Sequence, residues 1–197
     1  MNGFERRKEK KIEQIYSASF QLFAQYGFQK VSVNEIAHKA RVSPATVYNY
    51  FGTKERLYMD MLMDWMDKQL LQYEEILAEA SLTFPEKTKK IMLLEIENLK
   101  LLANELINDE RTDFMQSIEV HSEQKIADFF IRYVRLGKDE GYIHREQSEE
   151  VAMLYFTMFK NELGRHMRDS SPAEFSHTVD RMLELFFYGL AGQVRKS

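Results

Sequence analysis

The stretch Ser32–Lys54, which reads SVNEIAHKARVSPATVYNYFGTK, decides the fold because it contains two helix starts only eleven residues apart. The letters SVNE form a capping box, in which the serine hydroxyl accepts from the amide of Glu35 while the glutamate reaches back. Ser43 is a second helix cap, and Pro44 follows at the first helical position, where a missing N–H costs nothing. The stretch therefore predicts two short helices joined by a turn of three residues.

The second of these helices is predicted to present most of its surface to a partner. Val47 and Phe51 face the core, and the small residues Ala37 and Ala40 let the two helices approach closely. The positions left pointing outward are Pro44, Ala45, Thr46, Tyr48, Asn49 and Tyr50. A protruding helix fits the major groove of DNA, where its hydroxyl and amide groups reach base edges. A plain helical hairpin with surface tyrosines is the alternative interpretation.

The string VNEIAHKARVSPATVYNYFGTKERLY resembles the DNA-binding segment of the TetR family of bacterial transcriptional repressors. The pieces that carry the resemblance are IA at 36–37, VSPATVYNYF from Val42 to Phe51 and TKERL from Thr53 to Leu57. The preceding LFAQYGFQKVSV fits as well, so that the likeness covers about residues 10–60 and is architectural beyond them.

This resemblance assigns roles to individual positions. It implies DNA contacts at Thr46, Tyr48, Asn49 and Tyr50, with Pro44 and Ala45 at the helix tip, a phosphate clamp at Lys54, and caps at Ser32 and Ser43 that also touch phosphate. Arg41 departs from the pattern, because the family usually has glycine there. If that residue is left-handed, arginine costs on the order of 1 kcal/mol, unless its side chain points at phosphate. The N-terminal cluster of basic residues either follows the DNA backbone or is a solvated end.

The rest of the chain is predicted to be helical, because it has only three prolines and eight glycines and shows no long period-two alternation. Gly27 is placed to end the first helix in a left-handed conformation. We expect an all-α fold of about nine helices. They comprise the two capped by Ser32 and Ser43 and those over 6–26, 53–80, 85–107, 109–118, 122–140, 148–169 and 172–191. A three-helix helix-turn-helix head is thus joined by a long fourth helix to a larger body.

The charge is divided unevenly between head and body. Residues 1–56 hold ten lysines and arginines against five acidic residues, whereas residues 57–197 hold 17 against 26. A basic head on an acidic body indicates a polyanionic partner for the head only. We expect a DNA-binding domain over 1–56 and a ligand-binding and dimerisation domain over 57–197.

The resemblance implies that the body forms a homodimer and encloses an effector cavity. In the last helix the segment LELFFYGLAG is apolar nearly all round and must be covered on more than one side, by a second copy or within the monomer core. The expected dimer contacts are Tyr155, Leu163, Met182, Leu185, Phe186 and Leu190. The expected contacts of a small, largely apolar effector are Met61, Trp65, Glu95, Asn98, Tyr155 and Phe159.

Several classes of function lack their signatures. No cysteine is present, no apolar run approaches the roughly 20 residues that span a bilayer, and the N-terminus lacks the apolar core of a signal peptide. We therefore expect a cytoplasmic protein. No phosphate loop, nucleophile elbow or metal motif occurs, which predicts no enzyme, no metal and no cofactor. A DNA-binding repressor released by an effector is expected; a ligand-responsive activator and an all-helical adaptor are the alternatives.

Overall fold

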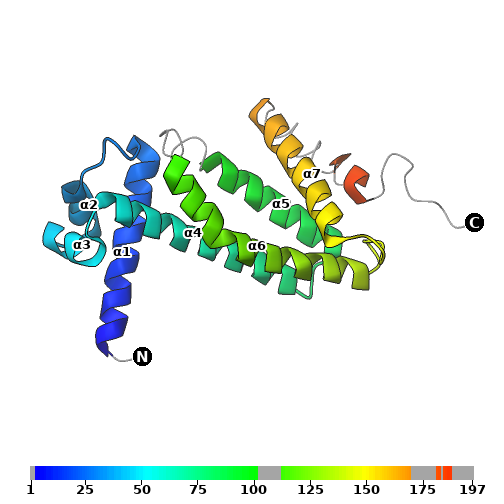
Figure 1. Ribbon diagram of the computed structural model, residues 1–197, viewed down its shortest axis with the longest axis horizontal. Helices are drawn as coiled ribbons and strands as arrows, with labels where there is room; N and C mark the ends of the chain where they lie inside the picture. Colours follow the sequence, from blue (N-terminus) through cyan, green and yellow to red (C-terminus); the bar gives the residue numbers. More distant parts are fainter. Residues whose placement is uncertain (1–2, 102–111, 170–180, 183, 188–197) are drawn as a thin grey trace, which may run out of the picture. The chain divides into compact units, whose positions relative to one another are not determined.

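The computed structural model describes residues 3–101, 112–169, 181–182 and 184–187, and every regular element within these ranges is an α-helix (Figure 1). The helices are α1 (Gly3–Tyr26), α2 (Val33–Ala40), α3 (Pro44–Phe51), α4 (Lys54–Ala78), α5 (Phe84–Leu101), α6 (Thr112–Asp139) and α7 (Glu149–Asp169). The predicted all-α fold is confirmed. None of the described helices is long and apolar enough to cross a membrane.

The predicted helix ends of the first three helices are confirmed by their caps. Ser32 forms the full capping box, in which its hydroxyl accepts from the Glu35 amide at 3.3 Å and its own amide donates to the Glu35 carboxylate at 2.8 Å. The Ser43 hydroxyl accepts from the Thr46 amide at 3.1 Å. Gly27 follows α1 with φ at 81°, as its expected role in ending that helix requires.

The chain divides into two compact units. We call the described residues within 1–69 and 101–123 the head, and those within 70–100 and 124–197 the body. The sequence suggests a domain boundary between residues 56 and 57, and this boundary stays a prediction. In the structure, the residues of α4 up to Gln69 pack with the head.

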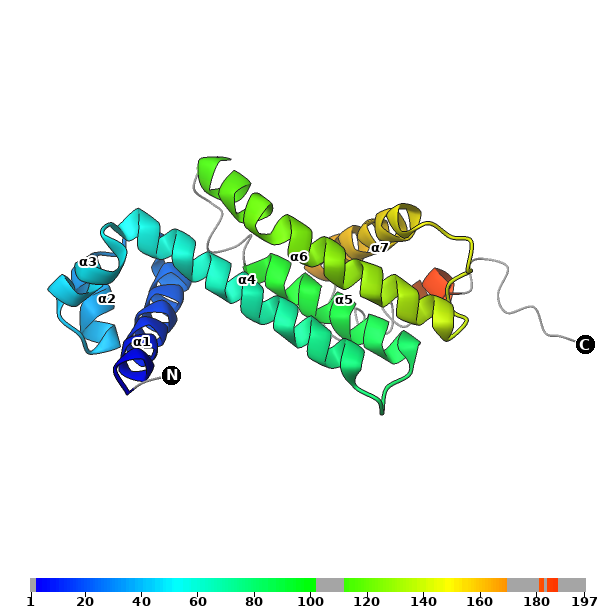
Figure 2. The same ribbon diagram turned by 60° about the horizontal axis from the view of Figure 1, so that its bottom comes forward.

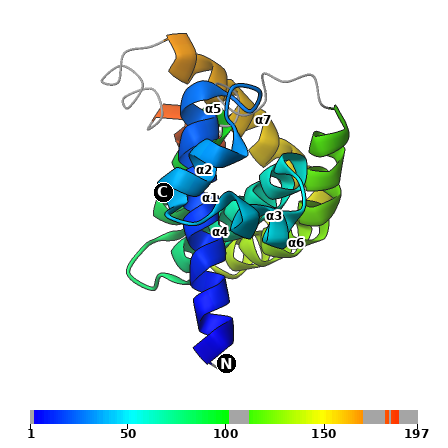
Figure 3. The ribbon, with the colours of Figure 1, turned by 90° about the vertical axis from the view of Figure 1, so that its left-hand side faces the viewer.

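The head is built around one apolar core. Helix α2 packs against α1, and α3 packs against α2 (Figure 3). Fully buried side chains from α1, α2 and the start of α4 fill the centre, among them Ile15, Phe23, Ile36 and Leu57. This core fixes the two short helices, which could not be stable in isolation at eight residues each.

The body packs the second part of α4 beside α5 and α6 (Figure 2). Its core contains Leu77, Phe84, Ile91 and the buried face of α6, and α7 and residues 186–187 add aromatic rings to it. The buried hydroxyls of Thr88 and Tyr133 lie 2.8 Å apart and satisfy each other.

The structure corrects the helix count in one region. Residues 109–118 and 122–140 were expected as two helices, but α6 is continuous from Thr112 to Asp139. The fifth helix was expected to reach residue 107, but residues 102–111 lie outside the described ranges. Of the last expected helix, 172–191, only 181–182 and 184–187 are described, and these residues are helical.

Candidate functional site

Helix α3 exposes one face and buries the other. Val47 and Phe51 are buried, as predicted, in the core of the head. The exposed side chains are those of Pro44, Ala45, Tyr48 and Asn49. Of this group Asn49 offers an amide that can both donate and accept at a base edge, and Tyr48 offers an exposed ring and hydroxyl.

Two residues expected on the outward face of α3 are only half exposed. The Thr46 hydroxyl lies 2.9 Å from the Ser43 hydroxyl, so it takes part in the helix cap. The Tyr50 ring packs against Phe51, with the ring centroids 6.2 Å apart, and against the core. Each therefore has a structural contact beside the DNA contact predicted for it.

The cap of α2 already holds an anion. Both the amide and the hydroxyl of Ser32 donate to the carboxylate of Glu35, at 2.8 and 2.7 Å. These backbone and side-chain hydrogen bonds from Ser32 lower the pKa of Glu35 below its ordinary value. A phosphate approaching Ser32 would have to compete with this carboxylate, whereas the amides at the start of α3 face no such competitor among the described contacts.

Lys54 lies at the first position of α4, as predicted, but its ammonium group is engaged within the head. The Nζ atom donates to the backbone oxygen of Phe28 at 2.9 Å and to that of Val31 at 3.0 Å. It also lies 4.2 Å from the centroid of the Phe28 ring. The predicted phosphate contact would have to use the remaining N–H of this group or displace these bonds.

Arg41 has the left-handed conformation that its place in the turn suggested, with φ at 56° and ψ at 43°. Its neighbours on this side of the head are also basic: Lys10, Lys39 and Arg41 contribute to the wall of a hollow of about 490 Å³ between α1 and the end of α2. The other basic residues of the N-terminal cluster, Arg6, Arg7, Lys8 and Lys11, are exposed. Residues 5–13 of α1 thus hold five basic residues against three acidic ones.

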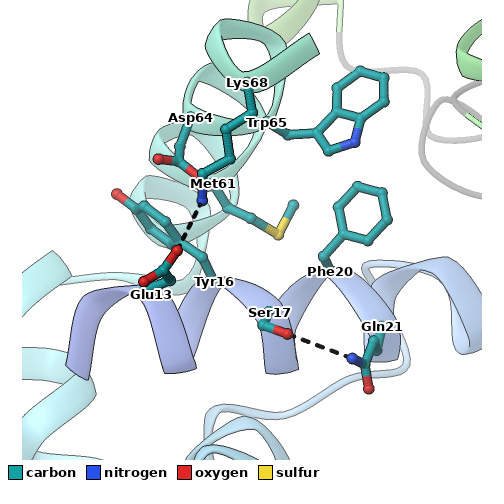
Figure 4. Close-up of a pocket in the computed structure, with 9 residues that line it drawn as sticks. All are labelled: Glu13, Tyr16, Ser17, Phe20, Gln21, Met61, Asp64, Trp65 and Lys68. Carbon is teal, nitrogen blue, oxygen red and sulfur yellow. Dashed lines mark hydrogen bonds and ion pairs between the residues drawn. The ribbon is translucent and has the colours of Figure 1, made fainter. Parts of the chain in front are cut away.

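Met61 and Trp65, which were expected to contact an effector in the body, lie in the head (Figure 4). Both line a cavity of about 360 Å³ between α1 and α4. Met61 is fully buried in the head core, and the Trp65 ring stacks on Phe20 with centroids 5.9 Å apart. Their effector contact stays a prediction.

Charged groups close one side of this cavity. The Lys68 ammonium lies 2.9 Å from the Asp64 carboxylate and 3.6 Å from that of Glu13, and thereby links α4 to α1 (Figure 4). Burial, together with the carboxylates of Asp60 and Asp64, raises the pKa of Tyr16 to about 12. The tyrosine is therefore neutral at physiological pH.

Glu95 and Asn98, two of the expected effector contacts, both form a hydrogen bond with a tyrosine of α4. The Tyr73 hydroxyl donates to Glu95, and the Asn98 amide donates to the Tyr73 oxygen at 2.9 Å. Burial and the nearby Glu95 charge raise the pKa of Tyr73. Sequence reasoning missed Tyr73, because nothing in the spacing along α4 reveals a partner 22 residues away.

The body contains a mainly apolar cavity of about 330 Å³. Its walls come from α6, α7, the segment between them and residues 186–187, and include Tyr133, Ile143, Ala152 and Tyr155. Tyr155 was among the expected effector contacts. Phe159 lies beside this cavity, because its ring contacts those of Tyr155 and Phe186, with centroids 5.0 and 4.9 Å away. Glu95 and Asn98 do not line it.

An exposed apolar stripe runs along α7. Val151, Leu154, Tyr155 and Met158 follow the spacing of one helical face, and between 40% and 61% of each residue's surface is exposed. Leu185, also predicted at the dimer interface, is exposed as well.

The other predicted dimer residues differ in their surroundings. Met182 and Phe186 pack partly on the body core, and the Phe186 ring also stacks on Tyr155 at 4.9 Å. The side chain of Leu163 and all of Leu190 lie outside the described residues. Their places at an interface stay predictions.

Comparison with known proteins identifies the head most directly. Residues 15–61 match the family described as bacterial regulatory proteins, tetR family. The HTH-type transcriptional regulator YuxN of Bacillus subtilis is 41% identical over 60 residues, which are 30% of this chain and 21% of YuxN. The fatty acid metabolism regulator protein of Bacillus subtilis is 27% identical over 100 residues, 51% of this chain and 50% of that protein. The chain thus spans about half or less of the length of these curated relatives.

The fold comparison extends over the body. The transcriptional regulator FadR from Bacillus subtilis, solved in complex with stearoyl-CoA, superimposes with a TM-score of 0.68. The match covers 90% of this chain and 98% of that one at 20% sequence identity, so it concerns the fold alone. The relatives matched are transcriptional regulators and not enzymes. The match over residues 15–61 and the curated relatives together support a regulator of the tetR family of bacterial regulatory proteins.

Proposed function

We propose that this protein is a transcriptional repressor that binds a palindromic operator as a homodimer and is released by an effector with a long acyl chain. The observation that supports it best is the exposed face of α3, which carries Tyr48 and Asn49 within residues 1–56, a segment that holds ten lysines and arginines against five acidic residues. A short, protruding, capped helix of this kind is what the major groove accepts.

In this proposal the head reads DNA through α3. Asn49 and Tyr48 meet base edges and neighbouring phosphates, while Pro44 and Ala45 let the helix tip approach the groove closely. The exposed basic residues on α1 add contacts to phosphates, which raise affinity without adding sequence preference.

A dimer is proposed because α3 is short. A single eight-residue helix contacts too few base pairs to select one genomic site. The exposed stripe on α7, with Leu154 and Met158 at its centre, offers the apolar surface that a second copy would cover. A two-fold dimer would present two α3 helices and would require inverted half-sites.

The effector class is suggested by the relatives and by the body cavity. One relative is named for fatty acid metabolism, and a protein of the same fold holds stearoyl-CoA. The body cavity is mostly apolar, and its volume of about 330 Å³ lies in the range of ligand sites. The effector need only bind more tightly to the state that cannot bind DNA. A coupling free energy of roughly 1–3 kcal/mol between effector and DNA binding lowers the affinity for DNA 5- to 150-fold.

The test uses the purified full chain in two steps. Selection from a random DNA pool should enrich an inverted repeat, and stearoyl-CoA should then release that DNA while coenzyme A without an acyl chain should not. Enrichment of no sequence would contradict DNA reading, whereas binding that ignores stearoyl-CoA would contradict only the effector class. Transcription from the selected site should rise when the protein is removed; a fall would indicate an activator.

A further inference from the structure

We propose that Lys54 is a positioning residue, which ties the chain before the helix-turn-helix to the chain after it, instead of clamping a DNA phosphate. This inference rests on the proposed DNA-binding function, and it changes how one of the predicted contacts acts. It comes from the unusual number of partners that one half-buried ammonium group has inside the head.

The two carbonyl groups that bind Lys54 belong to the connection between α1 and α2. Phe28 and Val31 lie between Tyr26, where α1 ends, and Val33, where α2 begins, so neither oxygen belongs to a helix. Hydrogen bonds of 2.9 and 3.0 Å from a charged donor are among the strong ones in proteins. The Phe28 ring, 4.2 Å from the same ammonium, adds a cation–π contact.

Moving this ammonium to a phosphate would leave the connection poorly satisfied. The residues that own the two carbonyls are buried, with 5% of Phe28 and 2% of Val31 exposed. A buried carbonyl that loses its donor without gaining water is destabilising. An ammonium group has three N–H bonds, and two of them are already committed to these oxygens.

These contacts join the two outer ends of the helix-turn-helix segment. Val31 immediately precedes Ser32, the cap of α2, and Lys54 comes three residues after Phe51, the end of α3. One side chain therefore closes the helix-turn-helix at both of its outer ends. The orientation of α3, and with it the place of Asn49 relative to α2, is held by this closure.

The experiment compares substitutions of Lys54 in the full-length protein on the selected operator. Lys54→Met keeps the packing but removes the donor, and Lys54→Gln keeps an amide donor without the charge. Lys39→Met, which neutralises an exposed lysine at the end of α2, is the matched control. We measure operator affinity over a range of salt concentrations, and amide hydrogen exchange of residues 29–34 without DNA.

We expect Lys54→Met to bind operator about 10- to 100-fold more weakly, with an unchanged dependence on salt and faster exchange over 29–34. Lys54→Gln should lie between it and the wild type, again with the salt dependence unchanged, and Lys39→Met should exchange like the wild type.

Three outcomes would overturn the proposal. A salt slope lowered by about one unit in Lys54→Gln, with exchange unchanged, would make Lys54 a phosphate clamp. Faster exchange with unchanged operator affinity would mean that Lys54 stabilises the head without affecting DNA binding. If neither exchange nor operator affinity changes, Lys54 has neither role. If Lys54→Met does not fold, Lys54→Gln decides. If the wild-type protein selects no DNA, the proposed DNA-binding function is wrong. The exchange data would still show whether Lys54 stabilises the connection between α1 and α2.

Discussion

Helices α3 and α7 both expose one face, but the two faces have opposite chemistry. The exposed face of α3 carries Tyr48 and Asn49, in the segment 1–56 with its surplus of basic residues. The exposed face of α7 carries Val151, Leu154 and Met158, in a region of the sequence with a surplus of acidic residues.

The chemistry of each exposed face indicates which kind of partner it can bind. Polar and aromatic side chains with nearby cations remain well solvated until an anionic polymer replaces the water, so α3 suits DNA. An exposed row of aliphatic side chains gains free energy only when another apolar surface covers it, so α7 suits a second copy of the same stripe. Substitutions that exchange these properties should break the two functions separately.

Charges on α7 should have the largest effect. The double substitution Leu154→Glu and Met158→Glu places repelling carboxylates on the stripe, and we expect a monomer that binds operator at least about 1000-fold more weakly. Sedimentation and fluorescence anisotropy on the selected DNA measure the two effects. Leu71→Glu, at an exposed leucine of α4, should leave the protein dimeric. A variant that remains dimeric with both charges would remove α7 from the interface.

Substitutions on α3 should have a smaller effect and leave the dimer intact. Asn49→Ala should cost about 1–3 kcal/mol of operator binding and should relax the preference at one base pair in each half-site. Repeating the selection with this variant measures the change of preference. Gln14→Ala, which removes an exposed amide from α1, should leave the selected sequence unchanged. An identical sequence from both variants would mean that Asn49 does not read bases.

Arg41→Gly tests the turn between the two helices. Arg41 is the one non-glycine residue with a positive φ among the described residues, and a left-handed arginine costs about 1–2 kcal/mol more than glycine in strain. We expect the variant to unfold at a higher temperature. If operator affinity falls and its salt slope drops by about one unit, the arginine is retained for a phosphate contact.

The smallest expected effect concerns the α2 cap and pH. Because the folded-state pKa of Glu35 is lowered from its ordinary value of 4.5, its ionised form stabilises the head above that pH. This contribution is lost as the pH falls below about 4.5 through the folded-state pKa. Glu35→Gln should therefore show a weaker loss of thermal stability over that acidic range than the wild type. Parallel curves for the two proteins would mean that the capping box does not titrate.

The helix-turn-helix segment could be predicted almost to the residue because its signals are local. The capping box at Ser32, the Ser43-Pro44 pair and Gly27 each act on amides within a few positions, so the sequence contains both partners. Arg41 fits the same rule, since its left-handed conformation follows from its place after α2.

Other parts of the chain were predicted less well because their contacts join residues that are far apart in the sequence. Residues 109–118 and 122–140 were predicted as separate helices, but no glycine or proline interrupts 112–136, and α6 continues through Ser122. Met61 and Trp65 were predicted as effector contacts, and the sequence did not reveal that they line a cavity with Phe20 of α1, whose ring stacks on that of Trp65.

Footprinting of the wild-type protein on the selected DNA tests the central claim most directly, namely that two α3 helices read inverted half-sites. We predict two protected stretches related by two-fold symmetry, centred in major grooves separated by a whole number of helical turns. Asn49→Ala should weaken protection equally in both. A single protected stretch, or two in direct repeat, would contradict a two-fold dimer that reads DNA through α3.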